Sequence, residues 1–165
     1  MRLKPLTLKG SCQCGAVHFS VRSQQYYPYQ RCYCSICRKT QGGGGYAINL
    51  SADARTLKVR GQKSIRSYHP VMREKGKRPY RSDGERHFCG RCGTSLWVYD
   101  RNWPDLIHPY ASAIDSELPR SPQSTHLMLN YKPRWVEPVF KNGDKKFREY
   151  SRESIAEWHA RHGFI

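Results

Sequence analysis

Apolar residues along this chain occur in short segments, most of which are separated by glycine, proline, asparagine or aspartate. Short segments of this kind are typical of strands, because an amphipathic helix needs a longer stretch with a period near 3.6 residues. Val17, Phe19 and Val21 alternate with polar residues, as in a strand with one buried face, and His18 is expected on the polar face. The pattern predicts a mainly β, largely antiparallel fold with strands at residues 16–22, 46–50, 57–60, 95–99, 107–114 and 126–130.

One helix is predicted close to the end of the sequence. Ser151 is a suitable N-cap, and Glu157 would interact favourably with the positive N-terminal end of the helix. Ile155 and Trp158 are three residues apart and share one face, and Gly163 follows as a stop signal. We therefore expect a short C-terminal helix with one apolar face.

A polar segment rich in arginine and lysine occupies residues 67–86. It contains few residues that could fill a core, so a solvent-facing loop or an irregular hairpin is expected. The whole chain has 29 Lys and Arg against 13 Asp and Glu, a formal net charge of +16 and a pI near 9.8. This excess of positive charge favours polyanions or anionic small molecules as partners.

The length of 165 residues is sufficient for one domain with a sizeable core, so residues 1–165 are interpreted as a single domain. No apolar stretch approaches the roughly 20 residues needed to cross a bilayer. The N-terminal segment also lacks the apolar stretch of about 7–15 residues that secretory signals contain. We therefore expect a cytoplasmic protein with no membrane partner. Nothing in the pattern indicates an oligomeric state.

Cysteine spacing gives the strongest chemical signal. A reducing compartment disfavours disulfides, and an odd number of cysteines cannot pair completely. A Cys-x-x-Cys turn brings two thiolates to one zinc ion, and Gly15, Gly90 and Gly93 are expected to relieve the backbone of such turns. The seven cysteines form three tight groups, which are Cys12 with Cys14, Cys32 with Cys34 and Cys37, and Cys89 with Cys92. Metal binding, most simply of zinc, is the leading interpretation.

The number of cysteines suggests two zinc sites of different kinds. The first and last groups together provide the four ligands of a closed structural site, and the middle group leaves three ligands and one open position, as in catalytic zinc sites. Other partitions, or a histidine as an eighth ligand, would also satisfy the ions. A redox Cys-x-x-Cys at Cys89 and Cys92 and a single structural zinc with unligated thiols are further alternatives, although the chain lacks the βαβ context typical of such redox motifs.

Several motifs resemble those of one known family. GSCQCGAVHF, CYCSICRKTQGGGGYAINL and HFCGRCGTSLW are similar to motifs of the glutathione-dependent formaldehyde-activating enzymes, the GFA family, which also includes centromere protein V. HLMLNYKPRWVE resembles a late strand of that family, and ESIAEWHARHG resembles the C-terminal helix of a bacterial subgroup. Together these motifs cover nearly the whole chain.

The resemblance implies a mainly β, Mss4-like (β-tent) antiparallel fold that is stabilised by zinc. It implies a structural zinc at Cys12, Cys14, Cys89 and Cys92 and a second zinc at Cys32, Cys34 and Cys37. It also implies a carbon–sulfur lyase-like activity that joins glutathione, or another thiol, to formaldehyde or a related aldehyde to give a product such as S-hydroxymethylglutathione.

Candidate substrate contacts follow the second group of cysteines. A thiol substrate or a water is expected at the open position, where zinc would lower its pKa. The product oxygen would then need donors, for which the amides of residues 42–45 or the Arg38 side chain are candidates. Arg38 and Lys39 suit the carboxylates of glutathione. The substrate-binding residues predicted are Arg38, Lys39, Gly43, Gly44 and Tyr46.

Nucleic-acid binding is the alternative from another functional class. It rests on the basic residues of the polar segment, because phosphate neutralisation drives salt-dependent binding. No RRM signature or zinc-finger spacing accompanies this charge. His87 and His126 are candidate bases or ligands, and we favour a structural role for both. The basic residues concerned are Arg73, Lys75, Lys77, Arg78 and Arg81.

Overall fold

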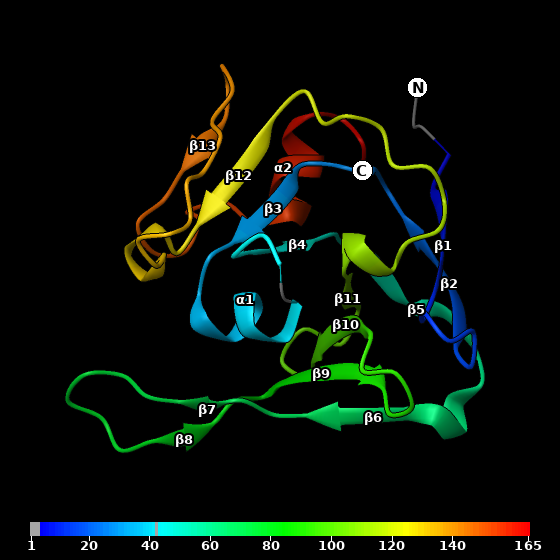
Figure 1. Ribbon diagram of the computed structural model, residues 1–165. Coiled ribbons are helices and arrows are strands. Elements are labelled where there is room, and N and C mark those ends of the chain that lie inside the picture. Colours follow the sequence, from blue (N-terminus) through cyan, green and yellow to red (C-terminus); the bar gives the residue numbers. More distant parts are fainter. Residues whose placement is uncertain (1–3, 42) are drawn as a thin grey trace.

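The computed structural model describes residues 4–41 and 43–165 and is built mainly from β-strands (Figure 1). The largest sheet has seven strands, and every neighbouring pair in it is antiparallel. In spatial order its strands are β1 (Leu6–Ser11), β2 (His18–Ser23), β5 (Ala52–Arg60), β11 (Leu106–Pro109), β10 (Ser95–Asp100), β9 (Gly84–Cys89) and β6 (Ile65–Tyr68). The mainly β fold predicted from the pattern and from the family resemblance is confirmed.

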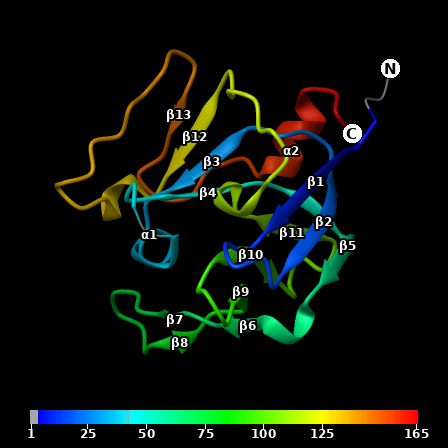
Figure 2. The ribbon, with the colours of Figure 1, turned by 45° about the vertical axis from the view of Figure 1, so that its right-hand side comes forward.

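A second sheet has four strands, in the order β13 (Lys145–Lys146), β12 (Ser124–Leu127), β3 (Tyr29–Cys32) and β4 (Ala47–Asn49). The β3–β4 pair is antiparallel, but β12 is parallel to both β3 and β13. Helix α1 (Ser35–Gln41) lies between this sheet and β9 (Figures 1 and 2). The parallel pairs were not expected from the local pattern.

The basic segment forms the irregular hairpin that was one of the two expectations for it. It continues the β6–β9 pair outward as β7 (Val71–Met72) and β8 (Tyr80–Arg81), and it projects from the body of the molecule (Figure 1). Glu74, inside the hairpin, accepts hydrogen bonds from Lys77 and from the hydroxyl of Tyr80. We call residues 71–81 the basic hairpin.

The predicted strands all contain β structure, but several bounds differ. The strand predicted at 57–60 is the second half of β5. The segment predicted at 107–114 leaves the strand conformation after Pro109 and continues as the 3-10 helix η2 (Ala111–Ala113). The segment predicted at 126–130 similarly ends in η3 (Leu129–Tyr131). The alternation in β2 is confirmed, because Phe19 and Val21 are buried and His18 is only half-buried.

The C-terminal helix is present as α2 (Ile155–Arg161), but its cap differs from the expectation. Ser154, not Ser151, is the N-cap, and it forms a capping box with Glu157. Ser151 instead hydrogen-bonds the backbone of Glu153 in the preceding turn. Ile155 and Trp158 form the buried face, as predicted. Among the described residues, no helix is long and apolar enough to span a membrane.

Candidate metal centres

The first candidate centre is a group of four cysteines, Cys12, Cys14, Cys89 and Cys92, which we call the four-cysteine cluster. Their Sγ atoms lie within 4.8 Å of one another, with distances of 3.6 Å between Cys12 and Cys14 and 3.8 Å between Cys14 and Cys89. Four thiolates bound tetrahedrally to zinc at about 2.3 Å would be roughly 3.8 Å apart. The residues therefore fit a zinc ion with four protein ligands.

Two tight turns bring these sulfur atoms together. The β1–β2 turn has Gly15 at φ +75°, and the β9–β10 turn has Gly93 at φ +77°, so both glycines have the conformation that the turns were expected to need. Gly90 does not have a positive φ, and the expectation for it was wrong. A Cβ at Gly90 would lie 2.8 Å from Cγ of Arg66, so its role is to permit close packing against β6.

The second candidate centre contains Cys32, Cys34 and Cys37, which we call the three-cysteine cluster. Their Sγ atoms also lie within 4.8 Å of one another. Cys32 ends β3, Cys37 lies in α1, and the Cys37 backbone N–H donates to Cys34 Sγ at 3.3 Å. Cys32 and Cys37 are buried, whereas Cys34 is partly exposed. An all-thiolate donor set of this size suits zinc with one coordination position left for another ligand.

Cys34 is the residue of this cluster at which negative charge is most stable. Hydrogen bonds from the Cys32 and Cys37 thiols lower the pKa of Cys34, and the nearby Arg86 guanidinium lowers this pKa further. The hydrogen bonds with Cys34 and Cys37 raise the pKa of Cys32, because one thiol must keep its proton while its neighbour is ionised. The cluster thus begins to ionise at its partly exposed sulfur.

Arg86 is a site residue that the sequence analysis missed. It lies on β9 and donates hydrogen bonds to the Tyr110 hydroxyl at 2.6 Å and to Cys37 Sγ at 3.7 Å. Tyr110 is fully buried, and burial raises its pKa to about 12, so it keeps its proton. Because the cluster comes from β3 and α1, only the packing of α1 against β9 brings Arg86 to it. No spacing or motif around Arg86 in the sequence indicated its contact with Cys37.

A buried chain of hydrogen bonds fixes the middle of the Cys-x-Cys segment. The Tyr33 hydroxyl lies 2.8 Å from His126 Nδ1, and His126 Nε2 lies 3.1 Å from Asp144 Oδ2. Asp144 also accepts the backbone N–H groups of Ser124 and Lys141, so its carboxylate acts as an acceptor throughout. His126 therefore donates a hydrogen bond from Nε2 to Asp144 and accepts one at Nδ1 from the Tyr33 hydroxyl. Its position supports the structural role expected for it.

The predicted substrate contacts lie along the chain after the three-cysteine cluster. Arg38 and Lys39 are in α1, and Gly43 and Gly44 are exposed in the loop before β4. Tyr46 precedes β4, and its ring lies 5.4 Å from that of Tyr33. Gly42, which belongs to the same predicted loop, lies outside the described residues. Within residues 4–41 and 43–165, the side chain that donates a hydrogen bond to a sulfur of this cluster from outside it is Arg86.

The three-cysteine cluster affects the ionisation of Tyr150. The Tyr150 residue is exposed as a whole, yet desolvation and then the charges of Cys34 and Cys32 raise the pKa of its hydroxyl. Tyr80 of the basic hairpin contributes to the same shift.

Comparisons with known proteins agree with the family resemblance. The family model described as glutathione-dependent formaldehyde-activating enzyme matches residues 7–129. A protein of Halomonas elongata, provisionally named as a glutathione-dependent formaldehyde-activating enzyme, is 57% identical over 158 residues, which cover 96% of this chain and 98% of the relative. A crystal structure of a Rhodobacter sphaeroides protein is similar with a TM-score of 0.52 and 27% identity, over 68% of this chain and 92% of that one.

Proposed function

Because the chain belongs to the family of glutathione-dependent formaldehyde-activating enzymes, we propose that it joins a thiol such as glutathione to formaldehyde or a related aldehyde. This reaction is of the carbon–sulfur lyase class, and we assign it to the three-cysteine cluster. The observation that carries the proposal is the division of seven cysteines into clusters of four and three. Four sulfur ligands complete a tetrahedral zinc site, whereas three leave a position for chemistry. The proposal thus includes two zinc ions per chain.

The reaction needs a thiolate and a proton donor. The thiol loses its proton, its sulfur forms a bond to the carbonyl carbon, and the carbonyl oxygen takes up a proton to give a hydroxymethyl thioether. A zinc ion held by Cys32, Cys34 and Cys37 would supply positive charge that favours an ionised thiol near neutral pH.

Arg86 acts in this proposal as a positioning residue. Its guanidinium donates to Cys37 Sγ, and its hydrogen bond to Tyr110 fixes its orientation. Three thiolates in a partly buried site repel one another, and a fixed positive charge beside them reduces this repulsion. The charge of Arg86 acts to lower the pKa of Cys34 and opposes the rise in the pKa of Cys37, so it favours the anionic form that a metal ion would bind.

Tyr150 is a further proposed donor to the product oxygen. Tyr150 is an exposed residue, and desolvation and then the charges of Cys34 and Cys32 raise its pKa, so it carries a proton at neutral pH. A phenol that lies near the thiolates can donate this proton, or a hydrogen bond, to an oxygen on which negative charge develops. The Arg38 side chain and the amides of Gly43 and Gly44 remain the other proposed donors.

The basic side chains near the cluster favour an anionic thiol. Glutathione carries two carboxylates, and Arg38 and Lys39 follow Cys37 directly in the sequence. The Arg38 Nε atom is buried without a hydrogen-bond partner among the described residues. Tyr46, whose ring lies 5.0 Å from the Arg31 guanidinium, is proposed as a wall of the same site.

A rate measurement on glutathione and formaldehyde tests this function. Magnetisation-exchange NMR reports how fast free and hydroxymethylated glutathione interconvert at equilibrium. Zinc-loaded wild type should accelerate this exchange beyond the spontaneous rate, and Cys34→Ser should abolish the acceleration while the protein remains folded. Cys14→Ser, in the four-cysteine cluster, is the matched control, and its rate per folded molecule should stay close to that of wild type. No acceleration by zinc-loaded wild type would overturn the assignment.

The basic hairpin also supports a second candidate, nucleic-acid binding. Among the described residues, its four basic side chains other than Lys77 form no ion pair, so their charge is available to phosphates. Binding to a DNA duplex that weakens steeply with salt and survives Cys34→Ser would favour this function over the enzyme. The residues concerned are Arg73, Lys75, Arg78 and Arg81.

A further inference from the structure

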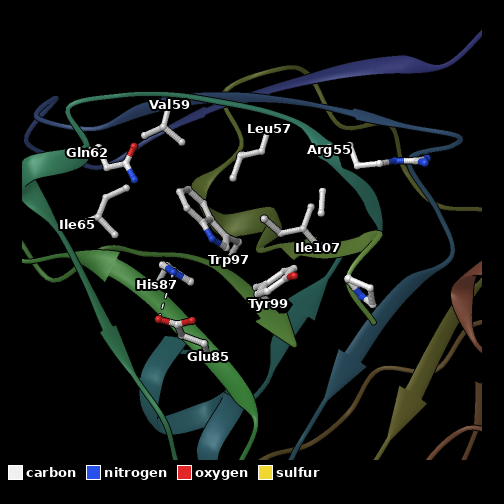
Figure 3. Close-up of a pocket in the computed structure, with 12 residues that line it drawn as sticks. Arg55, Leu57, Val59, Gln62, Ile65, Glu85, His87, Trp97, Tyr99 and Ile107 are labelled. Atoms are coloured by element: carbon white, nitrogen blue, oxygen red, sulfur yellow. Dashed lines mark ion pairs between the residues drawn. The ribbon is translucent and has the colours of Figure 1, made fainter. Parts of the chain in front are cut away.

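A pocket of about 520 Å³ lies apart from both cysteine clusters, on the large sheet (Figure 3). It forms because the chain leaves β5, turns at Gly61 and passes through the 3-10 helix η1 (Gln62–Ser64) to reach β6 at the far edge of the same sheet. This path carries β5 and η1 over β9, β10 and β11. The sheet thus curves around a hollow that stays open on one side.

The two sides of β9 serve different regions. Successive side chains of a strand point to opposite faces, so Glu85 and His87 face the pocket while Arg86 between them reaches the three-cysteine cluster. Trp97 and Tyr99 of β10 alternate in the same way and line the pocket. The pocket is therefore a separate surface and no extension of the candidate metal centre.

Eight of the twelve residues that line the pocket are apolar or aromatic. Leu57 lies above the rings of Trp97 and Tyr99, and Ile107 lies beside them (Figure 3). Trp97 is held rigidly, because Phe19 packs edge-on against it at 5.1 Å and the His87 ring stacks on it at 5.3 Å. Fixed rings of this kind provide a preformed surface for a ligand with an apolar body.

One end of the pocket carries the Glu85 carboxylate, and little positive charge lies beside it. Glu85 Oε1 lies 3.6 Å from His87 Nε2, a separation too long for a hydrogen bond, so the carboxylate can still accept one from a ligand. Arg55, the other basic residue among those lining the pocket, is held by Asp53 and Asp105 and points away from Trp97 (Figure 3). In a chain with a net charge of +16, this pocket is locally negative.

We propose that this pocket binds a small organic cation, an ammonium group on an apolar or aromatic body. The ammonium would pair with the Glu85 carboxylate next to the rings of Trp97 and Tyr99, and the apolar body would lie against Leu57 and Ile107. A carboxylate together with aromatic rings attracts an ammonium ion by charge and by cation–π interaction. An anion would be repelled by Glu85, and a neutral molecule would leave its carboxylate unpaired.

Three probes of nearly the same shape test the charge of the ligand. They are 2-phenylethylammonium, 2-phenylethanol and phenylacetate, added to ¹⁵N-labelled protein. The ammonium should shift the Trp97 indole N–H signal and the amide signals of β9 and β10, with an affinity about tenfold higher than that of the alcohol. Phenylacetate should bind most weakly.

Two variants separate the proposed contact from general attraction. Glu85→Gln keeps the shape of the side chain and should reduce the affinity for the ammonium to that for the alcohol. Glu137→Gln removes an exposed carboxylate outside the pocket and should leave the preference unchanged. The proposal is overturned if the ammonium causes no shift at Trp97 up to its solubility limit, if all three probes bind equally, or if Glu85→Gln keeps the preference for the ammonium.

Discussion

At the scale of single residues, the chemistry of this protein depends on alternation along β9. Arg86 and its two neighbours are adjacent in sequence, yet Arg86 contacts Cys37 on one face while Glu85 and His87 line the pocket on the other. The strand then ends at Cys89, a member of the four-cysteine cluster. A shift of one residue in the register of β9 would exchange the two faces and remove the guanidinium from the thiols.

Substitution of Arg86 should weaken metal binding at one cluster only. Arg86→Gln removes the positive charge and the hydrogen bond to Cys37, so the affinity of the three-cysteine cluster for zinc or cobalt should fall about tenfold or more. Arg86→Lys, which keeps the charge, should restore part of this affinity. Cobalt titration, followed by the thiolate-to-cobalt absorption of each cluster, measures the effect.

The control for Arg86 is an arginine outside both clusters. Arg101→Gln removes a surface ion pair with Asp83 and should change neither titration. Equal losses of affinity at both clusters in Arg86→Gln would indicate general destabilisation of the fold. An unchanged affinity would contradict the positioning role.

The grouping of the seven cysteines into two clusters could be predicted from the sequence, whereas the residues around the clusters could not. The Cys-x-Cys and Cys-x-x-Cys spacings are local, and two residues of separation suffice to place two sulfurs on one ion. The contact of Arg86 with Cys37 depends on how α1 packs against β9, and the bond between Tyr33 and His126 depends on the parallel pairing of β3 with β12. No spacing in the sequence encodes these non-local contacts.

At the scale of elements, the turn at Gly61 determines the shape of the large sheet. Gly61 has φ +83°, and a Cβ built on it would lie 1.8 Å from the carbonyl oxygen of Ala16. The chain therefore needs glycine here both for the left-handed conformation and for the close approach to the β1–β2 connection. This turn directs the chain from β5 over the pocket and on to β6.

A second glycine of similar conformation allows the effect of the left-handed conformation to be separated from the effect of the close approach. Gly76, in the basic hairpin, has φ +79°, but nothing lies within 4 Å of a Cβ built on it. Gly76→Ala should cost only the conformational strain, about 1 kcal/mol of unfolding free energy. Gly61→Ala carries the same strain plus a clash with backbone and should cost several times as much. Urea unfolding of both variants measures the difference, and equal losses would contradict the role of the close approach.

Strand prediction succeeded where the burial pattern is regular and failed where it is not. Val17, Phe19 and Val21 made β2 evident, but in β1 only Leu8 and Gly10 are buried, which is too weak a pattern to recognise. The N-cap of α2 was placed three residues too early, although only Ser154 has a glutamate three residues later, as a capping box requires. The local sequence therefore favoured Ser154, and the error lay in the choice of Ser151.

At the scale of the whole molecule, the two clusters have different relations to the fold. The four-cysteine cluster joins the β1–β2 turn to the β9–β10 turn, two connections on separate hairpins of the same sheet. The three-cysteine cluster joins only the end of β3 to the helix that follows it. A metal ion in the first cluster would therefore restrain distant parts of the chain, and one in the second would restrain a short segment.

Loss of metal from the four-cysteine cluster should thus destabilise the protein, and loss of metal from the three-cysteine cluster should abolish the proposed activity. Cys14→Ser leaves the four-cysteine cluster with three sulfurs and should cost several kcal/mol, which corresponds to a fall of about 10 °C or more in the unfolding midpoint. Cys34→Ser should lower the midpoint by only a few degrees.

In wild type, a chelator should remove the ion of the three-cysteine cluster first, because three thiolates hold a metal less firmly than four. The far-ultraviolet circular dichroism should change only when the second ion is lost. Metal analysis beside each spectrum identifies the step, and unfolding that accompanies loss of the first ion would contradict this division of roles.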